Sequence, residues 1–147
     1  MLGRNDYDFV IVGDGEEKER LQLLAEGNKH IHFVGKHDNV VEYYQAADVF
    51  VSSSLAEGLP NTVIEAMACG LPCVLSDIGP HEEILEYDPE AGLIARLGKN
   101  DWTEELNEVF GWNLQEKSEK ARKIIDNHLS KYIMAEKYAM LYQTKKI

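Results

Sequence analysis

Two glutamates, Glu57 and Glu65, are the residues of this sequence best suited to bind a ligand. Glu57 lies in a Glu-Gly-Leu-Pro loop, and Glu65 is the only charged residue in the body of the apolar segment that follows. An unpaired carboxylate on a buried helix costs several kcal/mol unless it gains donors or becomes neutral. Two neighbouring sugar hydroxyls would supply those donors, and so would a structural Arg or a pair of backbone amides.

The segment that carries Glu65 predicts a helix with defined ends. Pro60 suits the first helical position, and Gly70 suits a left-handed cap that ends the helix before Pro72. The residues between them are apolar nearly all round, so we expect this helix to be largely buried. The free N–H groups after Leu59, with the positive end of the helix dipole, form a seat for phosphate.

The stretch EGLPNTVIEAMACGLPCV resembles the Glu-x7-Glu signature of retaining GT-B glycosyltransferases of family 4, the group 1 glycosyl transferases. The resemblance extends from about Asp8 to Ile94. It implies an α/β fold with a Rossmann-like, doubly wound parallel sheet, the C-terminal half of a GT-B enzyme. It also implies transfer of a sugar from a nucleoside diphosphate sugar to a glycan or lipid acceptor, with retention of anomeric configuration.

The resemblance gives the two glutamates separate roles. Glu57 would contact the donor sugar as the catalytic residue, Glu65 would hold the ribose hydroxyls, and the amides of Asn61 and Thr62 would bind the diphosphate. Pro60 stands where many members have a glycine, and it has no N–H to offer. The other donor-binding residues that the resemblance implies lie in this loop and in two glycine turns: Gly58, Leu59, Pro60, Gly13, Gly15, Val34, Gly35 and Ser53. No metal and no cofactor besides the nucleotide sugar are expected.

Alternating strands and helices predict a parallel sheet with helices on both faces, although the strand order cannot be read from the sequence. Short apolar runs rich in β-branched and aromatic residues predict strands at 7–12, 30–34, 48–52 and 72–76. The segment 92–95 resembles the short final strand of the family. Helices are expected at 16–26, with Leu21 and Leu24 inward, at 38–47 and 60–70, and from 103 onward. The segment 77–85 is expected to turn through Gly79-Pro80 into a short helix.

Length and charge limit the class of protein. A chain of 147 residues predicts one Rossmann-like domain, 1–147, with an α/β core at 1–99 and C-terminal helices at 100–147. The net charge of -11 argues against nucleic acid and anionic membrane surfaces as partners. No apolar run approaches a membrane span and no signal peptide is evident, so a cytoplasmic location is expected. Peripheral membrane association of the full enzyme stays open.

Other motifs have plainer interpretations. Gly13-Asp14-Gly15 is either half of a dinucleotide fingerprint or, as we favour, a tight turn. His30 and His32 alternate on one strand and could grip a metal, but without an evident third ligand we favour surface histidines. Cys69 and Cys73 are expected to be free thiols. His81 stands in place of an apolar residue of the family and carries no functional weight.

The resemblance covers only the second GT-B half, without the Gly-Arg segment and Lys that precede it in the family. We therefore expect the N-terminal domain, or a partner chain, to contact the apolar helix that begins at Ser130, and the 147 residues alone to transfer no sugar. A non-catalytic nucleotide-sugar-binding module, or one half of a split enzyme, is the alternative. A phospho-accepting receiver domain would need an Asp where Ser52 to Ser54 end the third strand.

Overall fold

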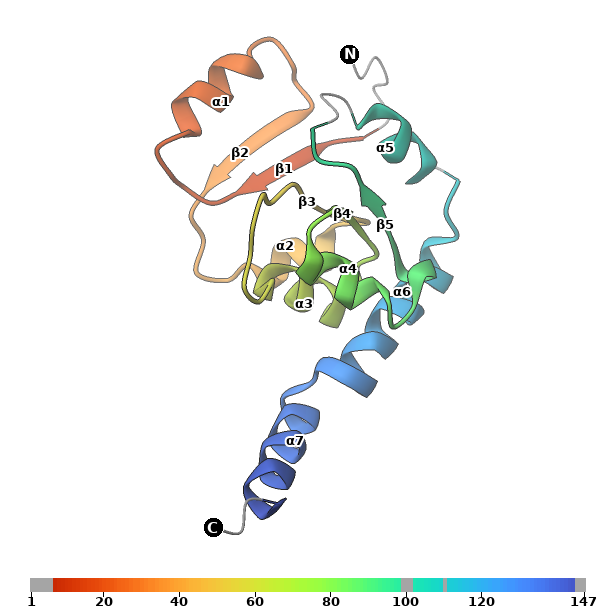
Figure 1. Ribbon diagram of the computed structural model, residues 1–147. Helices are drawn as coiled ribbons and strands as arrows, with labels where there is room; N and C mark the ends of the chain where they lie inside the picture. Colours follow the sequence, from red (N-terminus) through yellow and green to blue (C-terminus); the bar gives the residue numbers. More distant parts are fainter. Residues whose placement is uncertain (1–6, 99–101, 110, 145–147) are drawn as a thin grey trace. The chain divides into compact units, whose positions relative to one another are not determined.

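The computed structural model describes residues 7–98, 102–109 and 111–144. The chain divides into two compact units, residues 1–43 and 44–147, and each unit is described by itself (Figure 1). Both units contain parallel strands joined by helices, as the sequence predicts. The organisation as one domain stays a prediction.

The first unit is a strand, helix, strand motif. Strands β1 (Phe9–Val12) and β2 (Ile31–Gly35) pair in parallel, and helix α1 (Lys18–Leu24) connects them. Helix α1 is therefore shorter at both ends than the helix predicted at 16–26. Leu24 is 72% exposed, so the prediction that it points inward is wrong. A pair of short strands offers little apolar surface, and α1 buries none of its residues.

The second unit contains a three-stranded parallel sheet in the order β3-β4-β5, preceded by α2 (Val41–Ala46), which crosses the boundary between the units. Its strands are β3 (Phe50–Ser52), β4 (Cys73–Ser76) and β5 (Gly92–Ala95). All four residues of the central strand β4 are buried. The near-continuous apolar character of this strand is typical of a parallel strand covered on both faces.

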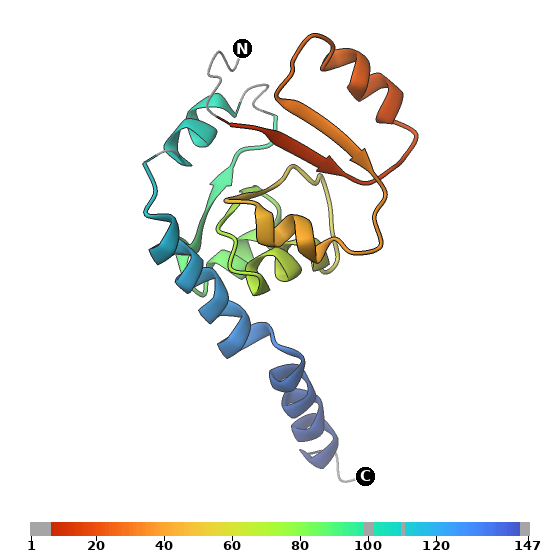
Figure 2. The same cartoon turned by 180° about the vertical axis from the view of Figure 1, so that it is seen from behind.

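After β3, the described residues of the second unit form five α-helices: α3 (Asn61–Ala68), α4 (Gly79–Leu85), α5 (Thr103–Val109), α6 (Leu114–Ile124) and α7 (Lys131–Thr144). A 3-10 turn, Pro89–Ala91, precedes β5, and a π-helical turn, Ile125–Leu129, separates α6 from α7 (Figure 2). Helix α3 packs on β3, β4 and α6. The core that these elements share includes Val63, Met67, Leu75, Ile84 and Ile124.

The C-terminal end of α3 is capped as predicted. Gly70 has φ 87°, and the N–H of Leu71 donates to the carbonyl of Ala66 at 3.0 Å. A glycine in this conformation, with a bond from the next residue back into the last turn, is a Schellman cap. The guanidinium of Arg122 on α6 donates to the carbonyl of Cys69 at 3.2 Å, which places a cation at the negative end of the α3 dipole.

Helix α7 exposes apolar and aromatic side chains, as the sequence predicts. Six large ones are more than half exposed: Tyr132, Met134, Tyr138, Met140, Leu141 and Tyr142. The partner expected for this surface stays a prediction. In the described part of the chain, no helix combines the length and apolarity that crossing a bilayer requires.

Candidate functional site

Glu65 lies on an exposed face of α3. Asn61, Glu65 and Ala68, at helical spacing, are exposed, whereas Val63 and Met67 on the other face are fully buried. The prediction that this helix is largely buried therefore holds for one face only, and exposure removes most of the desolvation cost of the Glu65 carboxylate. A small apolar side chain such as that of Ala68 can be exposed to solvent at little cost. The apolar composition of the segment therefore led to an overestimate of how much of the helix is buried.

The hydroxyl of Tyr44 faces Glu65. Its Oη donates to Glu65 Oε2 across 3.4 Å, a long hydrogen bond. Burial, followed by the negative charge of Glu65, raises the pKa of Tyr44 to about 12, so this hydroxyl stays a donor near neutral pH. Sequence reasoning counted Tyr44 only as apolar helix surface, and a separation of 21 residues gives no signal of the contact. No guanidinium within the described residues pairs with Glu65.

The N-terminal end of α3 offers free amides. Pro60 is the capping residue, so the helix begins one residue later than predicted. The N–H of Asn61 already donates to the carbonyl of Leu59 at 2.9 Å. Within the described residues, no hydrogen bond uses the N–H of Thr62 or Val63. Of the two amides predicted to bind phosphate, Thr62 is thus available in this structure, with Val63 beside it.

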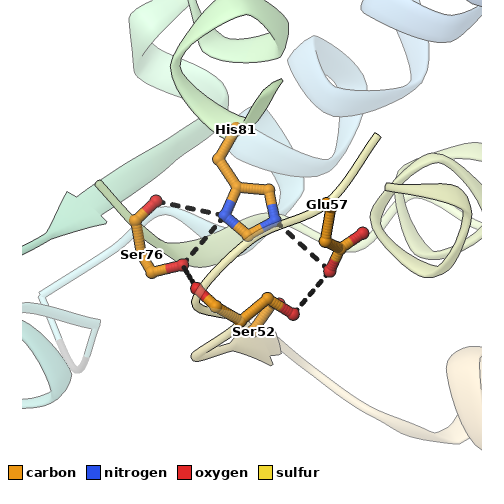
Figure 3. Close-up of polar contacts among 5 residues, drawn as sticks. Ser52, Glu57, Ser76 and His81 are labelled. Carbon is orange, nitrogen blue, oxygen red and sulfur yellow. Dashed lines mark hydrogen bonds and ion pairs between the residues drawn. The ribbon is translucent and has the colours of Figure 1, made fainter. Parts of the chain in front are cut away.

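Glu57 is held by groups on its own loop and on α4. Its side chain is 20% exposed, and Ser54 Oγ donates to its Oε1 at 2.5 Å. Ser52 Oγ in turn donates to Ser54 Oγ at 3.3 Å. The same Oε1 lies 3.9 Å from Nε2 of His81 (Figure 3). Glu57 is therefore fixed through one oxygen, and no hydrogen bond from a described residue reaches Oε2.

His81 is the site residue that sequence reasoning missed. It lies on α4 and is fully buried, with Nδ1 at 3.1 Å from both the carbonyl oxygen and Oγ of Ser76. Ser76 Oγ also donates to the carbonyl of Ser54 at 2.6 Å. These contacts join the carboxyl ends of β3 and β4, where open α/β sheets bind ligands.

Ser76, His81 and Glu57 have the residue types of a hydrolytic triad, but the geometry excludes that chemistry. Ser76 is fully buried, and its hydroxyl proton is directed at the carbonyl of Ser54. A nucleophilic serine instead needs access to substrate and a base that takes its proton. This cluster therefore positions groups and does not attack a substrate.

The other predicted site residues lie partly in the first unit. Gly13, Gly15, Val34 and Gly35 belong to residues 1–43, where the N–H of Gly13 donates to the carbonyl of Gly35 at 2.8 Å. The tight-turn interpretation fits Gly13, which has φ 140°. In the second unit, Ser53, Gly58 and Leu59 are exposed on the loop that follows β3.

Asp8 partners His32 of β2 and His30, the residue before this strand. Its Oδ1 lies 3.1 Å from His30 Nδ1 and 3.0 Å from His32 Nε2. These hydrogen bonds, that of His32 first, hold the pKa of Asp8 below its usual value. In the ranges that the structure describes, no three His, Cys, Asp or Glu residues are grouped to hold a metal.

Cys69 and Cys73 are free thiols, as predicted. Cys73 is fully buried in β4, and burial raises its pKa well above the usual value. A thiol in this state is a poor nucleophile, since the thiolate is the reactive form. Neither cysteine adds chemistry to the site.

Parallel strands joined by helices, with carboxylates and unpaired amides beyond the strand ends, define a Rossmann-like α/β fold of the kind that builds GT-B glycosyltransferases. The family described as glycosyl transferases group 1 matches residues 2–111. The chain belongs to this family.

Three similar proteins illustrate the relationship. The O-antigen biosynthesis glycosyltransferase WbnH of Escherichia coli is 32% identical over 130 residues, which cover 86% of this chain and 37% of WbnH. The UDP-Gal:alpha-D-GlcNAc-diphosphoundecaprenol alpha-1,3-galactosyltransferase of Escherichia coli is 34% identical over 93 residues, which cover 60% of this chain and 24% of that enzyme. The crystal structure of TarM superposes with a TM-score of 0.81 at 26% identity, covering 94% of this chain and 29% of TarM. The chain thus spans well under half the length of these relatives.

Proposed function

We propose that this chain forms the donor-binding half of a retaining glycosyltransferase that uses a nucleoside diphosphate sugar. The observation that carries the proposal is one loop and helix that present Glu57, the free amides of Thr62 and Val63, and the exposed Glu65 in succession. Two relatives support the donor class. The galactosyltransferase is named for UDP-Gal, and TarM of S. aureus has been solved in complex with UDP.

Each group in this loop and helix has a distinct role in the proposal. The diphosphate would accept hydrogen bonds from Thr62 and Val63, where the helix dipole also favours negative charge. Glu65 would accept hydrogen bonds from the ribose hydroxyls, with Tyr44 beside it. Glu57 would accept from a hydroxyl of the donor sugar through its open Oε2. Ser53, Gly58 and Leu59, which are exposed on the loop that follows β3, would border the donor.

The chemistry of the proposed transfer is stabilisation of the leaving group. Negative charge builds on the diphosphate as the sugar bond breaks, and dipoles already aimed at that charge lower the barrier. One helix terminus contributes only about 0.3 to 2 kcal/mol, whereas enzymatic acceleration needs roughly 8 kcal/mol or more. Other groups, which we place on an N-terminal domain or a partner chain, must supply the rest.

The 147-residue chain alone is therefore expected to bind donor without transferring it. Incubation with UDP-galactose, UDP-glucose or UDP-N-acetylglucosamine, followed by chromatography of the products, should show no sugar transfer. Turnover above the buffer control by the purified chain would contradict this prediction.

Replacement of Glu65 by Gln is expected to weaken UDP binding by about 10- to 100-fold. A hydrogen bond to a charged group contributes about 1.5 to 3 kcal/mol, and Gln keeps the size but removes the charge. Isothermal titration of the purified chain with UDP, GDP and ADP measures the affinities and identifies the base.

Glu119→Gln is the matched control, since Glu119 is an exposed glutamate on α6. Both variants should unfold at the same denaturant concentration as the original chain, because neither side chain is buried. Equal affinities for Glu65→Gln and Glu119→Gln would refute the assigned role of Glu65. Absence of binding to all three nucleotides would refute the proposed donor site.

A non-catalytic nucleotide-sugar-binding module is the second candidate, since one helix terminus contributes only a small part of the stabilisation that catalysis needs. The transferase needs a second GT-B half for activity, whereas the binding module does not. Transfer that appears when a chain carrying an N-terminal GT-B half is added supports the transferase. A cytoplasmic location and independence from metal remain part of the proposal for the complete enzyme.

A further inference from the structure

The position of the proton on His81 follows from its neighbours. Ser76 Oγ donates its one proton to the carbonyl of Ser54 at 2.6 Å, so towards His81 this oxygen can only accept. The carbonyl of Ser76, also 3.1 Å from Nδ1, can likewise only accept. Both contacts require Nδ1 of His81 to carry a hydrogen.

The second ring nitrogen of His81 is left without a partner. Nε2 is buried and makes no hydrogen bond to any described residue, and it faces Glu57 Oε1 at 3.9 Å (Figure 3). Because Nδ1 carries one hydrogen, Nε2 carries either a lone pair, in the neutral ring, or a second hydrogen, in the imidazolium. A lone pair opposite a carboxylate oxygen is unfavourable, whereas an N–H in that position is attracted to it.

No other carboxylate competes for His81 among the described residues. Glu57 is the one within ion-pair distance. Asp77, on the chain between Ser76 and α4, accepts the N–H of Leu97. Glu82 and Glu83, the neighbours of His81 on α4, are exposed. An added proton on the buried ring would therefore be balanced by Glu57.

We propose that His81 is a positioning residue for Glu57. In its doubly protonated form it donates from Nε2 to Glu57 Oε1, after the two atoms approach by about 1 Å to charge-assisted hydrogen-bond distance. Ser54 donates to the same oxygen. With Oε1 held from two sides, Oε2 points where a sugar hydroxyl can be accepted. The binding of a sugar hydroxyl by Oε2 rests on the proposed function, whereas the contact between His81 and Glu57 does not.

Nitrogen-15 NMR of the ring tests the contact directly in the 147-residue chain. Spectra of histidine-labelled protein, assigned with His81→Gln, show which ring nitrogens carry hydrogen. We expect hydrogen on both Nδ1 and Nε2 in the original chain, and an Nε2 resonance that shifts in Glu57→Gln, where the acceptor has lost its charge. Hydrogen on Nε2 alone, an Nε2 without hydrogen, or the same Nε2 resonance in the two proteins would overturn the proposal.

Binding measurements test the consequence for the donor. His81→Gln should weaken binding of a nucleotide sugar by about 2- to 10-fold and leave binding of UDP unchanged, as expected for loss of one modest interaction. The probe is whichever of UDP-galactose, UDP-glucose and UDP-N-acetylglucosamine binds the original chain more tightly than UDP. A merely structural role for His81 would weaken both ligands equally, and that result would count against positioning.

The two proposals fail in different ways. If UDP and all three nucleotide sugars fail to bind the original chain, the proposed function falls, and the NMR comparison alone decides the His81 contact. If His81→Gln does not fold, Gln variants of the other four histidines assign His81 by elimination. Glu57→Gln then still reports on the contact, because Glu57 is partly exposed and its replacement leaves the core intact.

Discussion

Replacing Gly92 by Ala is expected to lower the free energy of unfolding by about 3 kcal/mol, at the upper end of what overpacking costs. A Cβ at Gly92 would lie 2.4 Å from the carbonyl oxygen of Cys73. The two residues are paired across β4 and β5, so the obstacle is backbone of the central strand and cannot rotate away. The backbone at Gly92 is extended, so lack of space is the whole effect. Urea unfolding followed by circular dichroism measures it.

Gly15→Ala is the control for this change. A Cβ there meets nothing within 4 Å, and Gly15 does not have a left-handed φ. We expect its stability to stay within about 0.5 kcal/mol of that of the original chain. If Gly92→Ala unfolds at the same urea concentration as Gly15→Ala, the close packing of β5 on β4 is not as described.

Replacing Leu75 by Ala is expected to lower the free energy of unfolding by about 2 to 5 kcal/mol. Leu75 is fully buried in the central strand and packs in the core with Met67 of α3. Loss of its isobutyl group removes apolar burial and leaves a cavity below the helix that carries Glu65. Urea unfolding gives the change, and Leu55→Ala, at an 80% exposed position, is the matched control.

Leu55→Ala should change stability by less than about 0.5 kcal/mol, as is usual at exposed positions. Equal effects at Leu55 and Leu75 would contradict the assignment of β4 to the centre of the core. Binding of UDP by folded Leu75→Ala is expected to persist, since the side chain contacts the core and no exposed site residue.

Most of the elements could be predicted from the sequence, because each has a local signal. The strand expected at 92–95 is β5, and the strand expected at 72–76 contains β4. The cap at Gly70 was predictable because a left-handed conformation favours glycine. The order β3-β4-β5 was not, since pairing joins segments that are far apart in the sequence.

The candidate site could be predicted only where it follows one stretch of chain. Glu57 and Glu65 stand out by spacing and by the motif around them. His81 did not stand out, because its importance comes from its burial beside Ser76 and Glu57. The sequence around a histidine does not show which residues surround it in the fold. The burial of Glu65 was misjudged because the apolar pattern of α3 does not reveal which of its faces meets another element.

The hydrogen bond from Arg122 to the carbonyl of Cys69 ties α6 to the end of the helix that bears Glu65. The inner side of that helix is covered jointly by the sheet and by α6 with its π-helical extension. A shortened version of this protein that stops before residue 114 would therefore uncover the side of α3 that packs on α6 and on the π-helical turn. The smallest recombinant piece that keeps α3 covered on that side must extend at least through Leu129.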